Sequence, residues 1–110
     1  LPVAAALARA ADRELLGRLI ADADVVLDNF KPGTLERHGL GAREMLAAHP
    51  RLLWCTITGF GLESARPGYD FVVQAESGWM AITGDAEGSP MKVGVALADV
   101  LAGKDAAIQV

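Results

Sequence analysis

Apolar side chains recur at helical spacing in four stretches of the chain. In the first, Leu15, Leu16 and Leu19 would line one face of a helix, while charged side chains fall mostly on the opposite face. Pro50 and Gly84 mark the ends of the second and third stretches. The expected helices run over residues 12–23, 42–49, 70–83 and from 100 onward, with a short helical turn over residues 35–38 that stops at Gly39.

Two further apolar runs are continuous rather than periodic. Residues 25–27 and 51–58 carry large or β-branched side chains and end at polar or glycine-containing segments. This pattern is typical of strands that are buried on both faces of a parallel sheet. The order strand, helix, strand favours parallel pairing, so the sequence predicts an α/β fold.

Composition excludes several classes of partner. The 110 residues include 10 basic and 14 acidic side chains, a formal net charge of −4. Without a cluster of cations we expect no nucleic-acid binding, and no apolar run approaches the roughly 20 residues of a membrane span. The single cysteine, Cys55, cannot pair within the chain, which favours a reducing cytoplasmic setting. Because Cys55 lies inside an apolar expected strand, we expect its side chain to be a buried apolar group.

Asp99 is the strongest candidate for chemistry, because it stands between an apolar segment and the start of an expected helix. A plain N-cap is the simplest account of this position. Amides at a helix N-terminus also favour an ionised carboxylate, the form that acts as a nucleophile, so the two roles are compatible. Asp70 follows Tyr69 at another expected helix start, where a capping carboxylate beside a partly buried aromatic is again the simplest account.

A second group of candidates follows the first expected strand. Asn29, Phe30 and Lys31 lie just past its carboxyl end, where open α/β sheets usually bind ligands. An Asx-turn at Asn29 and a core position for Phe30 are the alternatives. Lys31 and Arg37 are suited to phosphate, although scattered cations are more often a solvated surface.

Other familiar motifs are absent or incomplete. Residues 59–64 begin like a dinucleotide-binding loop, but no helix opens directly after them and the third glycine is missing. His38, His49 and Cys55 lack the spacing of metal ligands, so we expect no metal. No serine stands in a nucleophile elbow.

Three segments, in order along the chain, carry a family resemblance. They are residues 23–37 (ADVVLDNFKPGTLER), residues 57–75 (ITGFG, then RPGYDFVVQA) and residues 92–103 (KVGVALADVLAG). These segments resemble the ADVVxENFRPGxxxR, ITGFG…RPGYDxxxQA and KVGxxxxDxxxG segments of the class III coenzyme A transferases. This is the CaiB/BaiF type, the family of formyl-CoA transferase.

The resemblance implies an enzyme that transfers coenzyme A from an acyl-CoA thioester to a free carboxylic acid. The family aspartate that matches Asp99 forms an aspartyl-CoA thioester intermediate, and the coenzyme A thioester is a co-substrate rather than a permanently bound cofactor. Asn29 and Phe30 match positions that contact the coenzyme, with Lys31 beside them. Arg37 matches an arginine that reaches its phosphates, a task suited to a guanidinium group.

Tyr69 and Asp70 match an aromatic and acidic pair near the catalytic centre of formyl-CoA transferase, whose acidic member is glutamate. The related 2-methylacyl-CoA racemases have a histidine where this chain has Tyr69, because they remove and return a proton with two acid-base groups. The resemblance therefore favours a transferase. A racemase and a non-catalytic α/β binding module remain the alternatives.

The resemblance also implies a larger architecture. The chain starts with Leu1 and stops within an apolar helical pattern, so we expect truncation at both ends. Residues 1–110 would form part of the large, Rossmann-like domain: a fragment of a parallel sheet with flanking helices, leading into a helical linker to a small domain. The intact parent would be an interlocked homodimer, and the 110-residue piece alone would be inactive.

Overall fold

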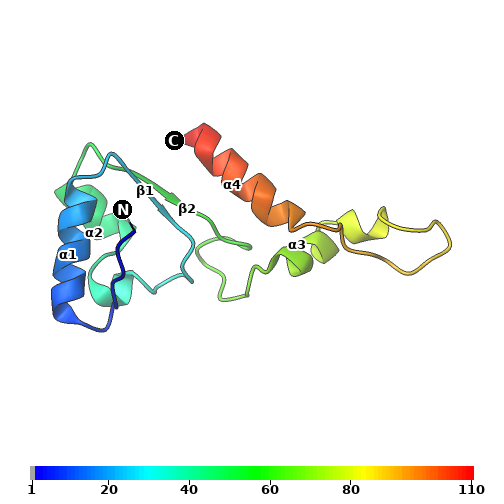
Figure 1. Cartoon of the computed structure of the whole chain (residues 1–110), viewed down its shortest axis with the longest axis horizontal. Helices are drawn as coiled ribbons and strands as arrows, with labels where there is room; N and C mark the ends of the chain where they lie inside the picture. Colours follow the sequence, from blue (N-terminus) through cyan, green and yellow to red (C-terminus); the bar gives the residue numbers. More distant parts are fainter. Residues whose placement is uncertain (1) are drawn as a thin grey trace. The chain divides into compact units, whose positions relative to one another are not determined.

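The chain folds as two compact units, the first ending at Thr56 and the second beginning at Ile57. The structure, a computed structural model, describes residues 2–110 (Figure 1). Within the described residues, no helix has the length and apolar character needed to cross a membrane.

The first unit contains a parallel two-stranded sheet, which confirms the predicted α/β class. Its elements are α1 (Ala10–Ala21), β1 (Val25–Asp28), the 3-10 helix η1 (Glu36–His38), α2 (Ala42–Ala48) and β2 (Leu53–Thr56). The register runs from Val25 opposite Leu53 to Asp28 opposite Thr56. The helical turn ends at Gly39, which adopts the left-handed conformation with φ 71°, as glycine does without steric cost.

The core of this unit lies between its helices and the start of β2. Leu40 and Leu52 are its buried apolar residues. A Cβ atom added to Gly17 of α1 would lie 3.9 Å from Leu40 Cδ2. Leu40 thus packs against α1 directly after the left-handed turn at Gly39, which explains why the chain reverses there.

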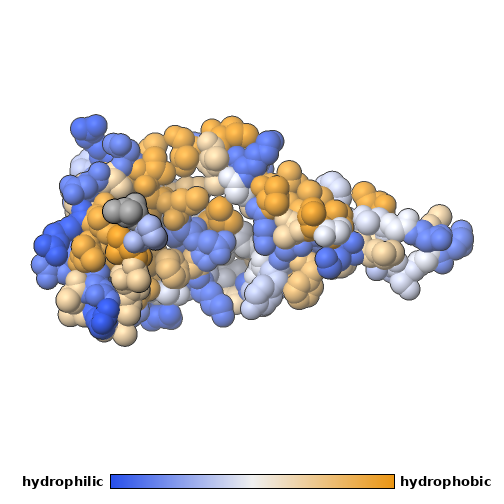
Figure 2. All heavy atoms as spheres, viewed as in Figure 1, coloured by the Kyte–Doolittle hydropathy of each residue, from blue (hydrophilic) through white to orange (hydrophobic). Residues whose placement is uncertain are grey.

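One face of the sheet is exposed, so the expectation that both faces are buried is wrong for the described residues. Val25, Leu27 and Leu53 are 39%, 56% and 51% exposed. Alternation along the strands and the parallel register place all three on the same face, together with Cys55, which is half-buried rather than buried. The sheet has two strands, and the three apolar side chains on this one face stay exposed. Figure 2 shows apolar side chains on the visible surface.

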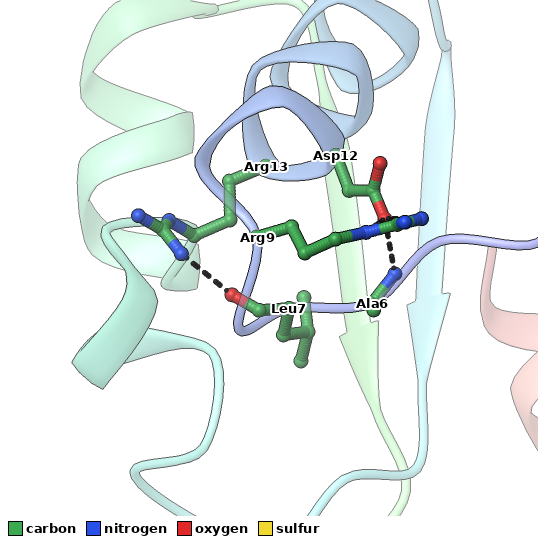
Figure 3. Close-up of polar contacts among 5 residues, drawn as sticks. All are labelled: Ala6, Leu7, Arg9, Asp12 and Arg13. Carbon is green, nitrogen blue, oxygen red and sulfur yellow. Dashed lines mark hydrogen bonds and ion pairs between the residues drawn. The ribbon is translucent and has the colours of Figure 1, made fainter.

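The chain before α1 folds back on the first turn of that helix (Figure 3). The Asp12 carboxylate accepts hydrogen bonds from the Ala6 backbone N–H at 2.7 Å and from the Arg9 guanidinium at 2.9 and 2.7 Å. Arg13 Nη1 donates to the Leu7 carbonyl at 2.8 Å. These contacts start the helix at Ala10, two residues before the predicted start, because Asp12 reaches back to the preceding backbone instead of capping the helix.

The second unit is built around two helices that pack against each other, α3 (Asp70–Glu76) and α4 (Leu97–Gln109). The single helix predicted over residues 70–83 is wrong. It breaks at Gly78, whose φ of 86° is left-handed, and a 3-10 helix, η2 (Trp79–Ala81), follows. A positive φ cannot continue a right-handed helix, and glycine adopts it readily.

Candidate functional site

Asp70 joins the two helices of the second unit. It is the first residue of α3, but its Oδ1 accepts the backbone N–H of Ala98 at 2.8 Å and, at 3.4 Å, that of Asp99. Both amides belong to the first turn of α4, where N–H groups have no partner within the helix. The N-cap residue of α4, Ala96, offers no side-chain hydrogen bond. Asp70 therefore caps α4 from another helix, and the expectation that it caps its own helix is wrong.

Gln74 completes this junction. It lies one turn after Asp70 on α3 and is only 1% exposed. Its Nε2 donates to Asp70 Oδ2 at 2.7 Å and to the Val95 carbonyl at 3.3 Å. Its Oε1 accepts the Val93 backbone N–H at 2.8 Å. Both polar atoms of the amide are thus satisfied, as a buried amide requires.

Asp99 presents its side chain to solvent. It lies in the first turn of α4, after the helix start at Leu97, so the expectation that it stands at the helix entrance as an N-cap is wrong. Asp99 is exposed. Within the part of the chain that the structure describes, its carboxylate has no hydrogen bond or ion pair.

An exposed aromatic pair flanks Asp70. The rings of Tyr69 and Phe71 are stacked, with centroids 6.0 Å apart and an interplanar angle of 3°. Tyr69 is 61% exposed, more than the partly buried position expected for it. Its backbone is extended, and α3 begins at the next residue. Tyr69 and Phe71 thus form an exposed stacked pair on either side of Asp70 in the chain.

A close crossing of two glycines fixes the segment that leads to Tyr69. A Cβ atom on Gly59 would lie 2.3 Å from Gly68 Cα, and one on Gly68 would lie 2.4 Å from Gly59 Cα. Neither position has room for a side chain, so packing explains Gly59 of the GFG segment and Gly68 of the RPGYD segment. The Arg66 guanidinium lies 4.0 Å from the centroid of the Phe60 ring and pairs with Glu76 of α3, which ties the loop to that helix.

In the first unit, a buried carboxylate holds the turn after β1. Asp28 Oδ2 accepts hydrogen bonds from Trp54 Nε1 at 2.8 Å and Thr56 Oγ1 at 2.6 Å. Its Oδ1 accepts the Phe30 backbone N–H at 3.1 Å. The Asx-type turn is therefore made by Asp28 and not by Asn29. Phe30 is 48% exposed, so its predicted alternative as a core residue is wrong.

The candidate ligand-binding residues of this unit are all accessible. Asn29, Phe30 and Lys31 are exposed after the turn, and Arg37 is exposed in η1, where its Nη2 lies 3.4 Å from Thr34 Oγ1. The first unit thus carries the residues expected to bind a coenzyme, and the second carries Tyr69, Asp70 and Asp99. Over residues 2–110, no group of three or more His, Cys, Asp or Glu side chains is arranged to hold a metal ion.

Two residues of these networks were missed by sequence reasoning. Gln74 follows Asp70 by four residues, which places both on one helix face, but the pattern gave no sign that this face meets the start of α4. Asp28 is separated from Trp54 and Thr56 by a whole crossover. Only the register of the parallel strands brings the three together.

Comparisons with known proteins agree on one family. The family described as CoA-transferase family III matches residues 2–110. A succinate–glutarate CoA-transferase from Agrobacterium fabrum is 46% identical over 92 residues, which cover 81% of this chain and 23% of that protein. A human succinyl-CoA:glutarate CoA-transferase is 40% identical over 93 residues, 82% of this chain and 21% of that protein. The chain therefore spans less than a quarter of the length of these two relatives.

Solved structures show the same likeness. A CaiB/BaiF family protein from Brucella suis superposes with a TM-score of 0.80 at 42% identity, over 96% of this chain and 30% of that one. A hypothetical protein from Mycobacterium tuberculosis gives a TM-score of 0.87 at 34% identity, over 97% of this chain and 32% of that one.

Proposed function

The chain belongs to CoA-transferase family III, and from this premise we propose that it is part of an enzyme that transfers coenzyme A from an acyl-CoA thioester to a free carboxylic acid. The two curated relatives described above are named for such transfers. The observation that carries the proposal is the exposed Asp99 carboxylate in the first turn of α4, free of side-chain partners within the described residues and held through its backbone by Asp70.

The proposed reaction uses Asp99 as a nucleophile. Its carboxylate oxygen attacks the thioester carbonyl, the C–S bond breaks, and coenzyme A leaves as a thiolate, giving a mixed anhydride. The thiolate then attacks the Asp99 carbonyl carbon and expels the donor acid as its carboxylate, giving an aspartyl-CoA thioester. The acceptor carboxylate repeats the two steps in reverse order and regenerates Asp99. No proton is transferred, so the chemistry needs no acid-base partner.

Asp70 and Tyr69 have different proposed roles. Asp70 acts through the backbone of Asp99 and is a positioning residue. Because Asp70 already occupies the amides of Ala98 and Asp99, these N–H groups do not serve as donors to the oxyanion that forms in each acyl transfer. The exposed hydroxyl of Tyr69 is the candidate donor that this arrangement leaves.

Coenzyme A is proposed to bind along the turn after β1. Asn29 and Phe30 offer an amide and an aromatic face, and the Lys31 and Arg37 side chains suit phosphate groups. Their exposure and their fixed turn support this role. We propose that residues 1–110 belong to the large domain of a homodimeric enzyme. The 23% of the Agrobacterium relative that the chain covers supports a parent longer than this chain.

Replacement of the proposed nucleophile tests the function in the full-length protein. Asp99→Asn removes the attacking charge, so kcat for coenzyme A exchange between two acids is expected to fall at least about a thousandfold. A hydroxylamine-trappable aspartyl thioester should disappear with it. The matched control, Asp105→Asn, removes an exposed carboxylate of the same helix and should retain both.

Two outcomes would contradict the proposal. Coenzyme A exchange that persists in Asp99→Asn removes Asp99 from the reaction. Deuterium wash-in at Cα of a 2-methylacyl thioester, without transfer to an acceptor acid, assigns the protein to the racemases instead.

A further inference from the structure

We propose that Gln74 is a positioning residue for the Asp99 carboxylate, an inference that rests on the proposed function. Its buried amide fixes the segment that leads into α4. Its Oε1 holds the Val93 N–H at 2.8 Å, and its Nε2 reaches the Val95 carbonyl at 3.3 Å. No other glutamine, asparagine or charged side chain in the described part of the chain is as deeply buried.

Gln74 and Asp70 lie on one face of α3 and bind different parts of the backbone around the start of α4. Gln74 binds the backbone before the helix start, at residues 93 and 95, and Asp70 binds the backbone after it, at residues 98 and 99. The residues that lead into Asp99 are therefore held from both sides by two side chains one helical turn apart. The hydrogen bond from Gln74 Nε2 to Asp70 Oδ2, 2.7 Å long, joins the contacts of both side chains into one hydrogen-bond network.

The hydrogen-bond network of Gln74 and Asp70 needs an amide at residue 74, not merely a side chain of the same size. Nε2 donates to two oxygens, a carboxylate and a carbonyl, while Oε1 accepts from an N–H. Leucine would fill the space but would leave the Val93 N–H and one Asp70 oxygen unpaired. A carboxylate would keep the Val93 contact but would face Asp70 Oδ2 and the Val95 carbonyl with negative charge.

Displacement of the α4 start acts on the reacting carboxylate rather than on coenzyme binding. Nucleophilic attack depends on placement to within a fraction of an ångström. The residues proposed to bind the coenzyme belong to the other unit. Loss of the Gln74 contacts is therefore expected to lower kcat while the KM for acyl-CoA stays nearly constant.

The glutamate variant adds a readout that a purely structural role would not produce. The Asp70 carboxylate is bonded directly to Gln74, and Lys92 Nζ lies 3.4 Å from the Val93 carbonyl. Asp99 on α4 contributes its backbone N–H to the network, not its carboxylate. In Gln74→Glu, two carboxylates share one proton site, which raises one of their pKa values. The one O–H of the protonated pair can restore the contact between residue 74 and Asp70, and the Val93 contact is kept, but the donation to the Val95 carbonyl is lost. Partial recovery of activity is therefore expected at low pH, and this activity is lost as the pH rises through the raised pKa.

The experiment compares Gln74→Leu, Gln74→Glu and the control Gln109→Leu, an exposed glutamine at the end of α4, in the full-length protein. We expect kcat to fall about 10- to 100-fold in Gln74→Leu, with KM for acyl-CoA within about twofold of the parent value. Gln74→Glu should regain kcat on acidification relative to the parent profile, and Gln109→Leu should match the parent.

The outcomes separate this proposal from the proposed function. Amide hydrogen exchange of Val93 and Ala98 should accelerate in Gln74→Leu whether or not the protein is a transferase. Unchanged kcat, or a parallel loss of kcat and acyl-CoA binding without acid recovery in Gln74→Glu, overturns the positioning role. If Gln74→Leu fails to fold, the pH profile of Gln74→Glu alone decides. A parent protein that forms no aspartyl thioester contradicts the proposed function instead, whatever the exchange rates.

Discussion

Asp28 does for the first unit what Asp70 does for the second: it fixes backbone next to the candidate residues. The Asp28 carboxylate accepts from three donors, the Trp54 indole, the Thr56 hydroxyl and the Phe30 amide. An asparagine at this position would present an NH₂ group to at least one of these donors. Leaving one buried donor unpaired costs about 1–3 kcal/mol of stability.

We therefore expect Asp28→Asn in the full-length protein to lower the free energy of unfolding by about 1–3 kcal/mol. The KM for acyl-CoA should rise because the Asn29 to Lys31 turn loses its anchor, while kcat changes little. Denaturant unfolding and steady-state kinetics measure the two effects. Asp24→Asn, at an exposed residue just before β1, is the control. Equal stability and equal KM in both variants would show that the Asp28 network does not hold the turn.

The exposed candidates were easier to predict than the residues that hold them. Asn29, Phe30 and Asp99 stand next to element boundaries, and boundaries are marked locally by glycine, proline and changes of periodicity. Asp28 and Gln74 act through partners 19 to 28 residues away along the chain. A sequence pattern carries no direct sign of such pairing, because it depends on the register of β1 and β2 and on the packing of α3 against α4.

At the scale of single elements, α1 offers a test of electrostatics. The Ala6 backbone hydrogen bond, followed by the bond from the Arg9 guanidinium, lowers the pKa of Asp12 below its ordinary value of 3.8. The ionised carboxylate thus stabilises the folded state at pH values above 3.8, and this contribution is lost as the pH falls through the lowered pKa. Acidification should therefore loosen the first turn of α1.

Asp12→Asn should remove this part of the pH dependence. We expect the thermal midpoint of the variant to lie below that of the parent protein at neutral pH, and the difference to shrink below pH 3.8. Added salt should also reduce it, because the pair with Arg9 is near the surface. Asp22→Asn, at the other end of α1, is the control. A constant difference between the Asp12 variant and the parent from pH 2 to 6 would contradict the assignment.

Some element boundaries agree with the prediction from the sequence, and others differ from it. The turn at Gly39 and the start of α3 at Asp70 are as predicted. The helix expected to continue to residue 83 stops because Gly78 takes a positive φ. The start of α4 at Leu97 is set by a carboxylate from α3, which no inspection of residues 97–110 would indicate.

At the scale of the molecule, the described residues bury little apolar surface, and from this we expect low stability for the 110-residue chain alone. The 11.5 kDa chain exposes 7950 Å², whereas a globular monomer of this mass exposes about 5,800 Å², and two separate globules of half the mass about 7,000 Å² in total. In the described part of the chain, the buried hydrophobic residues are only Leu40, Leu52 and Ala106. The α/β class was predictable from periodicity, but the exposure of the sheet face was not.

We expect the exposed apolar face of the sheet to be covered in the full-length protein. In the isolated 110-residue chain, its exposure is expected to lower the stability. The isolated chain should bind a hydrophobic dye, unfold without a sharp transition and show no coenzyme A transfer. In the full-length protein, amides of β1 and β2 should exchange more slowly than in the isolated chain, because packing on the face of Val25, Leu27 and Leu53 suppresses local opening. A cooperative transition of the isolated chain above about 5 kcal/mol would contradict this expectation. It would mean that the buried networks around Asp28 and Gln74, rather than apolar area, supply most of the stability.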